Sequence, residues 1–358
     1  MVLLYFLKWL QANQAEIQVD VLVLNGGDLE NEFKKSCCTF YDFSQIVKPI
    51  KLKFWQRVLL KLGCFKKPNR KEKLLIHLSQ NNYDIVYANT IVSIPTAVAL
   101  KKKNPNNKLV VHVHEMRSVL ELYRTSVIPF IELIDQFITV SNEANNDFIN
   151  FTSVNEDKVA MVYEFSDRIV FKKNNEKTHF VVGGAGTTSL RKGTDLFIQL
   201  ANLKKNNYAN LPIKFIWVGA ITGEFRLILN NELKKLGISD IIEFTDELES
   251  PETVFSTFDI FVLTSREDPF PLVCIEMGKL GIPIICFDKA NGISEIILKG
   301  GGKVVPYLDT IAIMNNVEFY INNSDHYHKD CAINKNQFIN FSALYQAPKI
   351  LNSIKHLL

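Results

Sequence analysis

The segment SREDPFPLVCIE (residues 265–276) is an acidic loop and helix start that decides the fold of this chain. An apolar run, FDIFVLTS (residues 258–265), leads into it, and a second apolar run, GIPIICFD (residues 281–288), follows a helix-like stretch. This order predicts a buried strand, a loop at its carboxyl end, a helix and another strand. Because α/β proteins bind ligands at the carboxyl ends of parallel strands, the loop is the expected position of a site.

Two carboxylates of this segment are candidate ligand contacts. Asp268 falls in the loop and Glu276 lies about one turn into the predicted helix, so both can face one pocket. The backbone N–H groups of a helix start can hold an anion such as a diphosphate. Together these groups suit a ligand with many hydroxyls and a phosphate, that is, a nucleotide sugar. The structural alternative is that Asp268 caps the helix and Glu276 is a solvated helix residue.

The segment resembles the E-x7-E motif of the retaining glycosyltransferases of family 4, which have the GT-B fold. Further motifs of that family follow in order along the chain. They are VYANT (86–90), VVHVHE (110–115), ITVSN (138–142), GGAGTTSLRKGTDLF (183–197), IKFIWVGA (213–220), GISEII (292–297) and GGGKVVPYLD (300–309). The resemblance implies two Rossmann-like, doubly wound α/β domains that face each other across a cleft.

The resemblance assigns roles to the acidic residues. Glu276 would bind the ribose hydroxyls of the donor and Asp268 the hydroxyls of the donor sugar. Family members usually carry glutamate at the first position, and aspartate is one methylene shorter, so Glu267 is a rival for that role. Pro269 and Pro271 have no N–H group, so donor contacts from this loop would come from the backbone of Phe270, Leu272 and Val273.

Arg191 and Lys192 are the candidate cations. A leaving nucleoside diphosphate needs its developing charge neutralised, and a Gly-rich turn with Gly184 and Gly186 ahead of these cations supplies donors and charge. Many relatives carry an arginine where this chain has Gly186, and Arg191 would replace that charge. The alternative is that both cations are surface residues of a turn.

Other candidates come from the resemblance to the family. His114 would face the reacting sugar and position or polarise it, with Glu115 behind it; the alternative is a structural histidine. Asn291, Gly292 and Glu295 are expected donor contacts, although Glu295 also suits a first-turn partner of a helix dipole.

Length and composition fit a soluble two-domain protein. The chain has 358 residues, 47% hydrophobic and 22% charged, and its six cysteines lack any zinc-ligand spacing. We expect an N-terminal acceptor-binding domain over residues 1–165, a linker over 166–177 and a nucleotide-sugar-binding domain over 178–340. A final helix, 341–358, would pack back on the first domain, with Pro348 breaking it or starting it anew. A reducing cytoplasm is the expected compartment.

The chain opens on a helical pattern, and its first clear strand pattern covers residues 19–24. The first strand and Gly-rich loop of the family are absent from this sequence. Three outcomes are possible at the central position: its neighbours close up, another segment fills it, or a gap remains. In each we expect this form to be weakly active or inactive while still binding nucleotide.

Residues 47–73, VKPIKLKFWQRVLLKLGCFKKPNRKEK, are basic and amphipathic, with only Glu72 opposing the charge. Such a segment is typical of contact with an anionic membrane surface, and the alternative is a core-packed helix with a solvated face. The predicted membrane contacts are Lys51, Lys53, Phe54, Trp55, Arg57, Lys61, Lys66 and Lys67. No nucleic-acid-binding signature accompanies them, so nucleic acid is not an expected partner.

The sequence therefore predicts a metal-independent, retaining glycosyltransferase without a cofactor. It would move a sugar from a nucleotide-sugar to a glycan or lipid-linked acceptor in cell-surface polysaccharide synthesis. Peripheral attachment to the inner face of the plasma membrane stays open. The alternatives are a weakly active or inactive nucleotide-sugar-binding protein of the same fold, a nucleotide-sugar 2-epimerase and a sugar phosphorylase.

Overall fold

The computed structural model describes residues 1–48, 62, 69–168 and 179–358. The chain divides into two compact units. The first comprises Met1–Val113, Tyr123–Ile138 and Ile350–Leu358, and the second comprises His114–Leu122 and Thr139–Lys349. The predicted linker, residues 166–177, lies mostly outside the described residues, and the predicted domain boundaries stay predictions.

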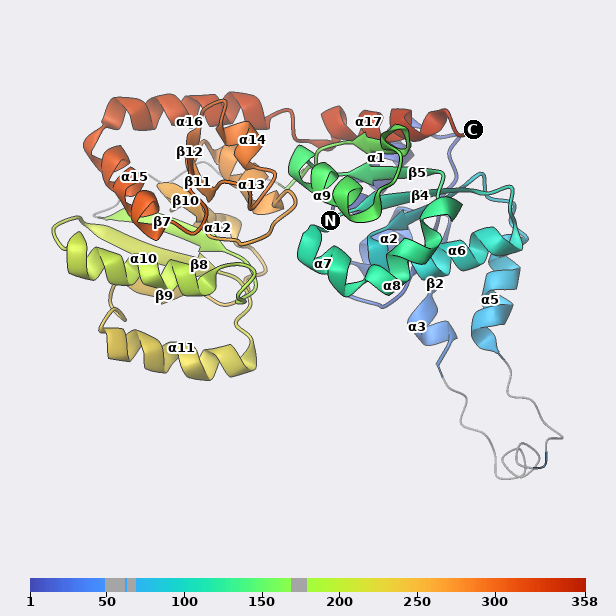
Figure 1. The fold of residues 1–358 in the computed structure, drawn as a ribbon, viewed down its shortest axis with the longest axis horizontal. Coiled ribbons are helices and arrows are strands. Elements are labelled where there is room, and N and C mark those ends of the chain that lie inside the picture. The colour runs from blue at the N-terminus through green and yellow to red at the C-terminus, as the bar shows by residue number, and fades with distance from the viewer. Residues whose placement is uncertain (49–61, 63–68, 169–178) are drawn as a thin grey trace. The chain divides into compact units, whose positions relative to one another are not determined.

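Strands and helices alternate along most of the chain (Figure 1). The strands are β1 (Asp20–Val23), β2 (Thr39–Asp42), β3 (Ile85–Asn89), β4 (Lys108–Val113), β5 (Gln136–Thr139), β6 (Val159–Met161), β7 (Phe180–Ala185), β8 (Ile213–Val218), β9 (Ile242–Phe244), β10 (Ile260–Leu263), β11 (Ile284–Phe287) and β12 (Gly302–Val305). The helices up to the first long gap are α1 (Val2–Asn13), α2 (Glu30–Lys35) and α3 (Phe43–Ile46). Those before β7 are α5 (Arg70–Ser79), α6 (Ile94–Lys103), α7 (Arg117–Leu122), α8 (Arg124–Val127) and α9 (Asn142–Thr152), with 3₁₀ turns at Ile91–Ser93, Ile128–Leu133 and Glu156–Lys158. Those after β7 are α10 (Thr194–Asn207), α11 (Gly223–Leu236), α12 (Glu252–Phe255), α13 (Leu272–Leu280), α14 (Ser294–Ile297), α15 (Thr310–Asn322), α16 (Ser324–Phe338) and α17 (Ala343–Lys355).

The second unit contains a parallel sheet with the strand order β12-β11-β10-β7-β8-β9. Strands β10 (IFVL) and β11 (IICF) are continuous, fully buried apolar runs because both faces of the sheet are covered. One buried cluster joins Phe197, Leu229 and Met314 from α10, α11 and α15, and another joins Ile275 and Phe338 from α13 and α16. Helices therefore cover both faces, as expected for a doubly wound domain (Figure 1). Cys274 and Cys286 are buried in this core, as predicted.

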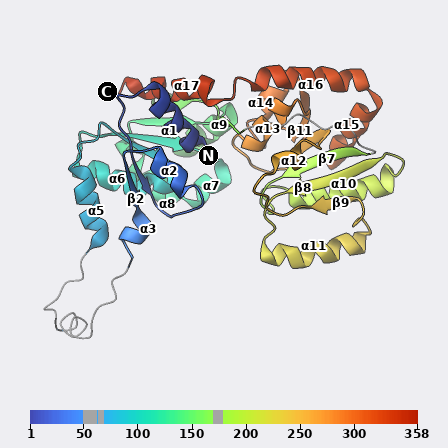
Figure 2. The same cartoon turned by 180° about the vertical axis from the view of Figure 1, so that it is seen from behind.

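The first unit starts with α1, as the sequence predicts, and its apolar face is buried at Val2, Leu4, Phe6, Leu7 and Leu10. In both views α1 runs beside residues 350–355 of α17 (Figures 1 and 2). The strands of this unit lie in two separate sheets. One is the parallel pair β1-β2, and the other contains the parallel pair β3-β4 with β5 next to β4.

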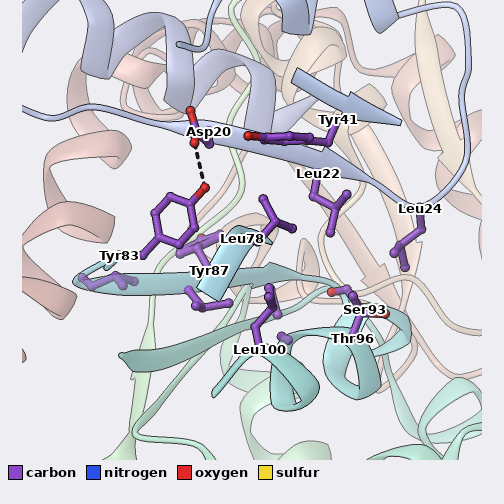
Figure 3. Close-up of a pocket in the computed structure, with 14 residues that line it drawn as sticks. Asp20, Leu22, Leu24, Tyr41, Leu78, Tyr83, Tyr87, Ser93, Thr96 and Leu100 are labelled. Atoms are coloured by element: carbon purple, nitrogen blue, oxygen red, sulfur yellow. Dashed lines mark hydrogen bonds between the residues drawn. The ribbon is translucent and has the colours of Figure 1, made fainter. Parts of the chain in front are cut away.

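A cavity of about 140 Å³ lies between β1 and β3 (Figure 3). Leu22 lines it from β1, and Val86 and Tyr87 line it from β3. In the described sheets β1 and β3 are not ladder partners. β2 is an element that the sequence analysis missed, because the half-exposed TFYD lacks a long apolar run.

The expected break at Pro348 is wrong. α17 continues from Ala343 to Lys355 with Pro348 inside it. A proline within a helix removes the hydrogen bond to the carbonyl four residues earlier, here that of Leu344. Leu344 is 66% exposed, so the residue that loses this bond lies on the solvent side of α17. Among the described residues, none of the helices has the length and apolar character that crossing a bilayer requires.

Replacing Gly183 with alanine should destabilise the second unit. A Cβ at Gly183 would lie 2.0 Å from Cδ2 of Phe258, whose side chain is buried, so the core must shift. Overpacking of this kind costs about 1–3 kcal/mol. Thermal unfolding should show a lower Tm for Gly183→Ala, whereas Gly223→Ala, which meets no atom within 4 Å, should unfold like the parent chain. Indistinguishable Tm values for the two variants would contradict the packing.

Candidate active site

The candidate site is formed by two loops at the carboxyl ends of β7 and β10, which are neighbours in the second sheet. The loop after β7 enters α10 through Gly193, whose φ of +67° is left-handed. A Cβ on Gly193 would lie 1.9 Å from the Thr264 carbonyl oxygen, so only glycine lets the two loops approach this closely. The loop after β10 carries Asp268 and enters α13 at Leu272.

An ion pair joins the two loops. Lys192 Nζ lies 2.6 Å from Asp268 Oδ2, and the same oxygen accepts a hydrogen bond of 3.1 Å from the Ser265 hydroxyl. Asp268 is only 6% exposed. The Thr264 hydroxyl donates to the Lys192 carbonyl oxygen at 3.0 Å. A partly exposed cation and a buried carboxylate are thereby held together at the carboxyl ends of β7 and β10.

Two arginines connect the same loops. Arg191 Nη1 donates to the Glu267 carbonyl oxygen at 2.9 Å, and the Arg266 N–H donates to the Arg191 carbonyl oxygen at 2.7 Å. Arg266 also forms a two-pronged pair with Asp195 at the start of α10, with both distances 2.9 Å. Burial raises the pKa of the Asp195 carboxyl, but the hydrogen bonds and charge of Arg266 outweigh it and leave the pKa lowered. The sequence analysis did not single out Arg266, although it lies inside the decisive segment.

Glu276 is 7% exposed, so the alternative of a solvated helix residue is wrong. Its carboxylate accepts a hydrogen bond of 3.3 Å from the Ser166 hydroxyl and lies 3.7 Å from Arg168 Nε. Burial raises the pKa of the Glu276 carboxyl, against the lowering by the Arg168 charge and by the Ser166 hydrogen bond. Its partners therefore differ from those of Asp268, and Ser166 and Arg168 are neighbours that the sequence did not reveal.

Close backbone packing explains why positions 291 and 292 hold an asparagine and a glycine. The Asn291 side chain is fully buried, donates to the Phe287 carbonyl at 3.0 Å and accepts from the Ser294 N–H at 3.0 Å. A Cβ on Gly292 would lie 2.2 Å from Cβ of Ser141. The Gly292 N–H donates to Asp268 and Pro269 carbonyl oxygens. Asn291 and Gly292 therefore fix the loop that carries Asp268.

The carboxylates of Glu267 and Glu295 have protein partners. Glu267 accepts hydrogen bonds from the N–H and the hydroxyl of Ser118, and Glu295 accepts from Asn142 and, at 3.0 Å, from the Tyr163 hydroxyl. Phe270 is buried, with its ring centroid 5.0 Å from that of Tyr163. Leu272 and Val273 are the first two residues of α13, where no side chain caps the helix. Their backbone N–H groups thus lie at the helix start, where an anion would be stabilised.

His114 lies directly after β4, as predicted. Its Nδ1 is 2.7 Å from Glu164 Oε1, and its backbone N–H donates to Glu115 Oε2 at 2.9 Å. His112, two residues earlier, is 2% exposed, and its Nδ1 is 2.6 Å from the Tyr87 hydroxyl. These contacts indicate a structural histidine of the core.

Gly184 and Gly186, the two glycines predicted for the Gly-rich turn, lie in different parts of the structure. Gly184 is inside β7, where a Cβ would lie 2.7 Å from Trp217, so its absence of a side chain serves core packing. Gly186 follows β7 with φ +141°, and a Cβ there would be 3.2 Å from the Lys192 side chain. Gly186 therefore borders the candidate site.

The predicted membrane contacts between Lys51 and Lys67 all lie outside the described residues. Within the described part of the chain, no three His, Cys, Asp or Glu side chains group as a metal site would require, and metal independence stays a prediction.

Two family profiles cover most of the chain. Residues 1–167 match the family described as Glycosyltransferase Family 4, and residues 165–337 match the one described as Glycosyl transferases group 1. The chain belongs to family 4 of the glycosyltransferases.

Solved structures of glycosyltransferases show that this chain has the GT-B fold. Anabaena HepE in complex with UDP and glucose superposes with a TM-score of 0.77 at 17% identity, covering 98% of this chain and 95% of that one. The lipopolysaccharide outer core galactosyltransferase WaaB in its apo form superposes with a TM-score of 0.73 at 16% identity, covering 100% of this chain and 95% of that one.

Curated relatives match over shorter regions. The O-antigen biosynthesis glycosyltransferase WclY of Escherichia coli is 28% identical over 158 residues, which is 42% of this chain and 42% of that protein. The alpha-galactosylglucosyldiacylglycerol synthase of Streptococcus pneumoniae is 31% identical over 133 residues, 34% of this chain and 31% of that protein. The match therefore spans less than half the length of these relatives.

Replacing Glu276 with glutamine should change the pH dependence of stability. Because burial raises the folded-state pKa above the ordinary value of 4.5, the stability that this group contributes is present below that value and is lost as pH rises through the folded pKa. Urea unfolding between about pH 4 and about pH 8 should show Glu276→Gln gaining stability relative to the parent as pH rises.

The matched control is Glu243→Gln, a replacement at an exposed position of β9. This variant should follow the parent chain across the same pH range. A difference between Glu276→Gln and the parent that does not vary with pH would contradict the burial of the charged carboxylate.

Proposed function

We propose that this protein transfers a sugar from a nucleotide-sugar donor to a glycan or lipid-linked acceptor, with retention of anomeric configuration, in the synthesis of a cell-surface polysaccharide or glycolipid. The observation that carries this proposal is the ion pair of Lys192 with the buried Asp268 at the carboxyl ends of β7 and β10 in a family 4 chain. The names of its relatives support the class of product, since they include O-antigen synthesis and a glycosyldiacylglycerol synthase. The complexes of HepE with UDP and with UDP-glucose support the class of donor.

The reaction exchanges one glycosidic bond for another. The bond between the anomeric carbon and the β-phosphate oxygen breaks, and the electron pair leaves with the nucleoside diphosphate. An acceptor hydroxyl oxygen forms the new bond to the same face of the anomeric carbon. Its proton passes to the departing phosphate oxygen, so atoms and charges balance without a cofactor.

Each residue of the site would have its own role in this reaction. Lys192, the Gly186 turn and the N–H groups of Leu272 and Val273 would hold the diphosphate, where charge develops as the bond breaks. Asp268 would accept hydrogen bonds from sugar hydroxyls and Glu276 from the ribose. Arg191 would act by holding the loop of Glu267, and His114, oriented by Glu164, would position the reacting sugar.

Removing the Lys192 charge should slow turnover. Loss of one such group costs about 2–4 kcal/mol of transition-state stabilisation, or roughly 30- to 900-fold in kcat. Lys192→Met also leaves Asp268 buried without its cation, which destabilises the fold. Steady-state kinetics should therefore be measured together with thermal unfolding.

The double variant Lys192→Met, Asp268→Asn separates the two effects, because it removes both charges of the pair. It should recover stability without recovering turnover, and Lys234→Ala on the exposed face of α11 serves as the control. A Lys192→Met enzyme with unchanged kcat would remove Lys192 from the mechanism.

A panel of nucleoside diphosphates and their sugars tests the donor class. We expect one base to raise the Tm and labelled sugar from the matching donor to appear in an acceptor fraction. Nucleotide binding with no transfer would favour the inactive binding protein, and interconversion of free nucleotide-sugars would favour the 2-epimerase. If no nucleotide shifts the Tm, the proposal fails.

A membrane-bound acceptor would also fit the basic segment at residues 47–73. The chain should bind vesicles that contain anionic lipid, and salt should weaken the binding because it screens lysine and arginine charges. Co-sedimentation with anionic and with neutral vesicles at low salt measures this. Equal binding to both vesicle types would contradict an electrostatic contact.

A further inference from the structure

The Glu276 carboxylate is held through one of its two oxygens. The Ser166 hydroxyl donates to Oε1 at 3.3 Å, and Arg168 Nε lies 3.7 Å from the same oxygen. In the part of the chain that the structure describes, neither a hydrogen bond nor an ion pair reaches Oε2. A buried carboxylate oxygen needs a hydrogen-bond donor. The protein therefore fixes Oε1 and leaves Oε2 for a hydroxyl group of a ligand.

The Ser166 backbone is anchored on two sides. Lys279 Nζ donates to the Ser166 carbonyl oxygen, and the Ser166 N–H donates to the Phe341 carbonyl oxygen at 3.2 Å. The next residue, Asp167, accepts a hydrogen bond of 3.0 Å from the Ala343 N–H at the start of α17. These anchors keep the Ser166 hydroxyl in place, as a group that orients another side chain requires.

Arg168 acts on Glu276 through its charge. Its Nε lies 3.3 Å from Glu252 Oε1 of α12 and 3.7 Å from Glu276, so one cation lies between two carboxylates. Burial raises the pKa of the Glu276 carboxyl, and the Arg168 charge is the largest effect that lowers it. The Ser166 hydrogen bond and the Lys279 charge lower it less, and the Glu252 charge raises it. Arg168 therefore favours the ionised carboxylate, which is the stronger hydrogen-bond acceptor.

We propose that Arg168 and Ser166 are positioning residues for Glu276, which hold Oε1 so that Oε2 accepts a hydrogen bond from the ribose of a bound nucleotide. This inference rests on the proposed function, which assigns the ribose to Glu276. Arg168 and Ser166 need not touch the nucleotide, because both act through the carboxylate. A carboxylate that is already fixed at one oxygen loses less conformational freedom when the ribose binds, so binding is stronger.

Nucleotides with and without ribose hydroxyls distinguish this role from a general one. The probes are UDP, GDP and ADP, each with its 2′,3′-dideoxy analogue, and isothermal titration calorimetry gives the Kd of both for the base that binds. The parent chain should bind the ribonucleotide roughly 10- to 100-fold more tightly, the range for one hydrogen bond to a charged acceptor. The ratio of the two Kd values cancels any effect of a substitution on the diphosphate contacts or on the folded fraction.

Arg168→Met should reduce this ratio by roughly fivefold or more, because a rotated or protonated carboxyl group is a weaker acceptor. Arg168→Lys keeps a cation beside both carboxylates and should restore most of the ratio. Ser166→Ala should lower the ratio in the same direction, and Glu276→Gln should lower it as well. The matched control is Lys34→Met, which removes the cation of the exposed Lys34–Glu30 pair in α2 and should leave the ratio unchanged.

Thermal unfolding at pH 7 without nucleotide tests the contact itself. Arg168→Met leaves the buried Glu276 carboxylate beside Glu252 without this cation, so the Tm should fall. Adding Glu276→Gln removes the buried charge and should recover part of the loss. Tm losses that simply add in the double variant would show that the two side chains do not interact, and would overturn the proposal.

The binding data separate this inference from the proposed function. A Kd ratio that Arg168→Met leaves unchanged, whether or not both affinities fall, overturns the inference and leaves the proposed function standing. A parent chain that binds a ribonucleotide and its dideoxy analogue equally overturns the ribose contact of Glu276 and the inference with it. A parent chain that binds none of the six nucleotides overturns the proposed function and the inference together.

Discussion

The ion pair between Lys192 and Asp268 is the interaction on which the candidate site depends. It joins the loops that follow β7 and β10, and its carboxylate is almost completely buried. Removing two charges from water is costly unless they pair with good geometry and further hydrogen bonds. The Ser265 hydroxyl supplies such a bond to the Asp268 carboxylate, and the Thr264 hydroxyl and the Gly292 N–H hold the backbone carbonyls of Lys192 and Asp268 in place. The need for close loop contact in turn explains Gly193, which no residue with a side chain could replace without displacing Thr264.

The two units solve the same packing problem differently. In the second, β7 fills the centre of the sheet, and its glycines let Phe258, Trp217 and Phe197 pack directly on the backbone. In the first, a cavity lies between β1 and β3. The hydrogen bond from Tyr83 to Asp20 and the apolar cluster that includes Leu22, Leu75 and Val86 hold the β1-β2 sheet in place. We therefore expect β1 and β2 to open at lower free energy than the strands around β7, because fewer buried neighbours restrain them.

Strands with long apolar runs could be predicted from the sequence, since β10 lies within FDIFVLTS (258–265) and β8 within IKFIWVGA (213–220). β2 could not, because a short edge strand with half-exposed side chains carries little periodic signal. The loop-to-loop pairing of Lys192 with the Asp268 region was also predictable, since both follow strands that end at one edge. The partners of Glu276 were not: Ser166 and Arg168 are more than a hundred residues away, and only tertiary packing brings them together. Local propensity likewise failed at Pro348, which lies inside α17.

The most direct test of the account is a crystal structure of this protein soaked with the nucleoside diphosphate that it binds best. The account predicts density for the diphosphate between Lys192 Nζ, the turn at Gly186 and the start of α13, with the ribose hydroxyls on the Glu276 carboxylate. A diphosphate bound elsewhere, with the Lys192–Asp268 pair still closed and Glu276 still in contact with Ser166 and Arg168 only, would contradict it.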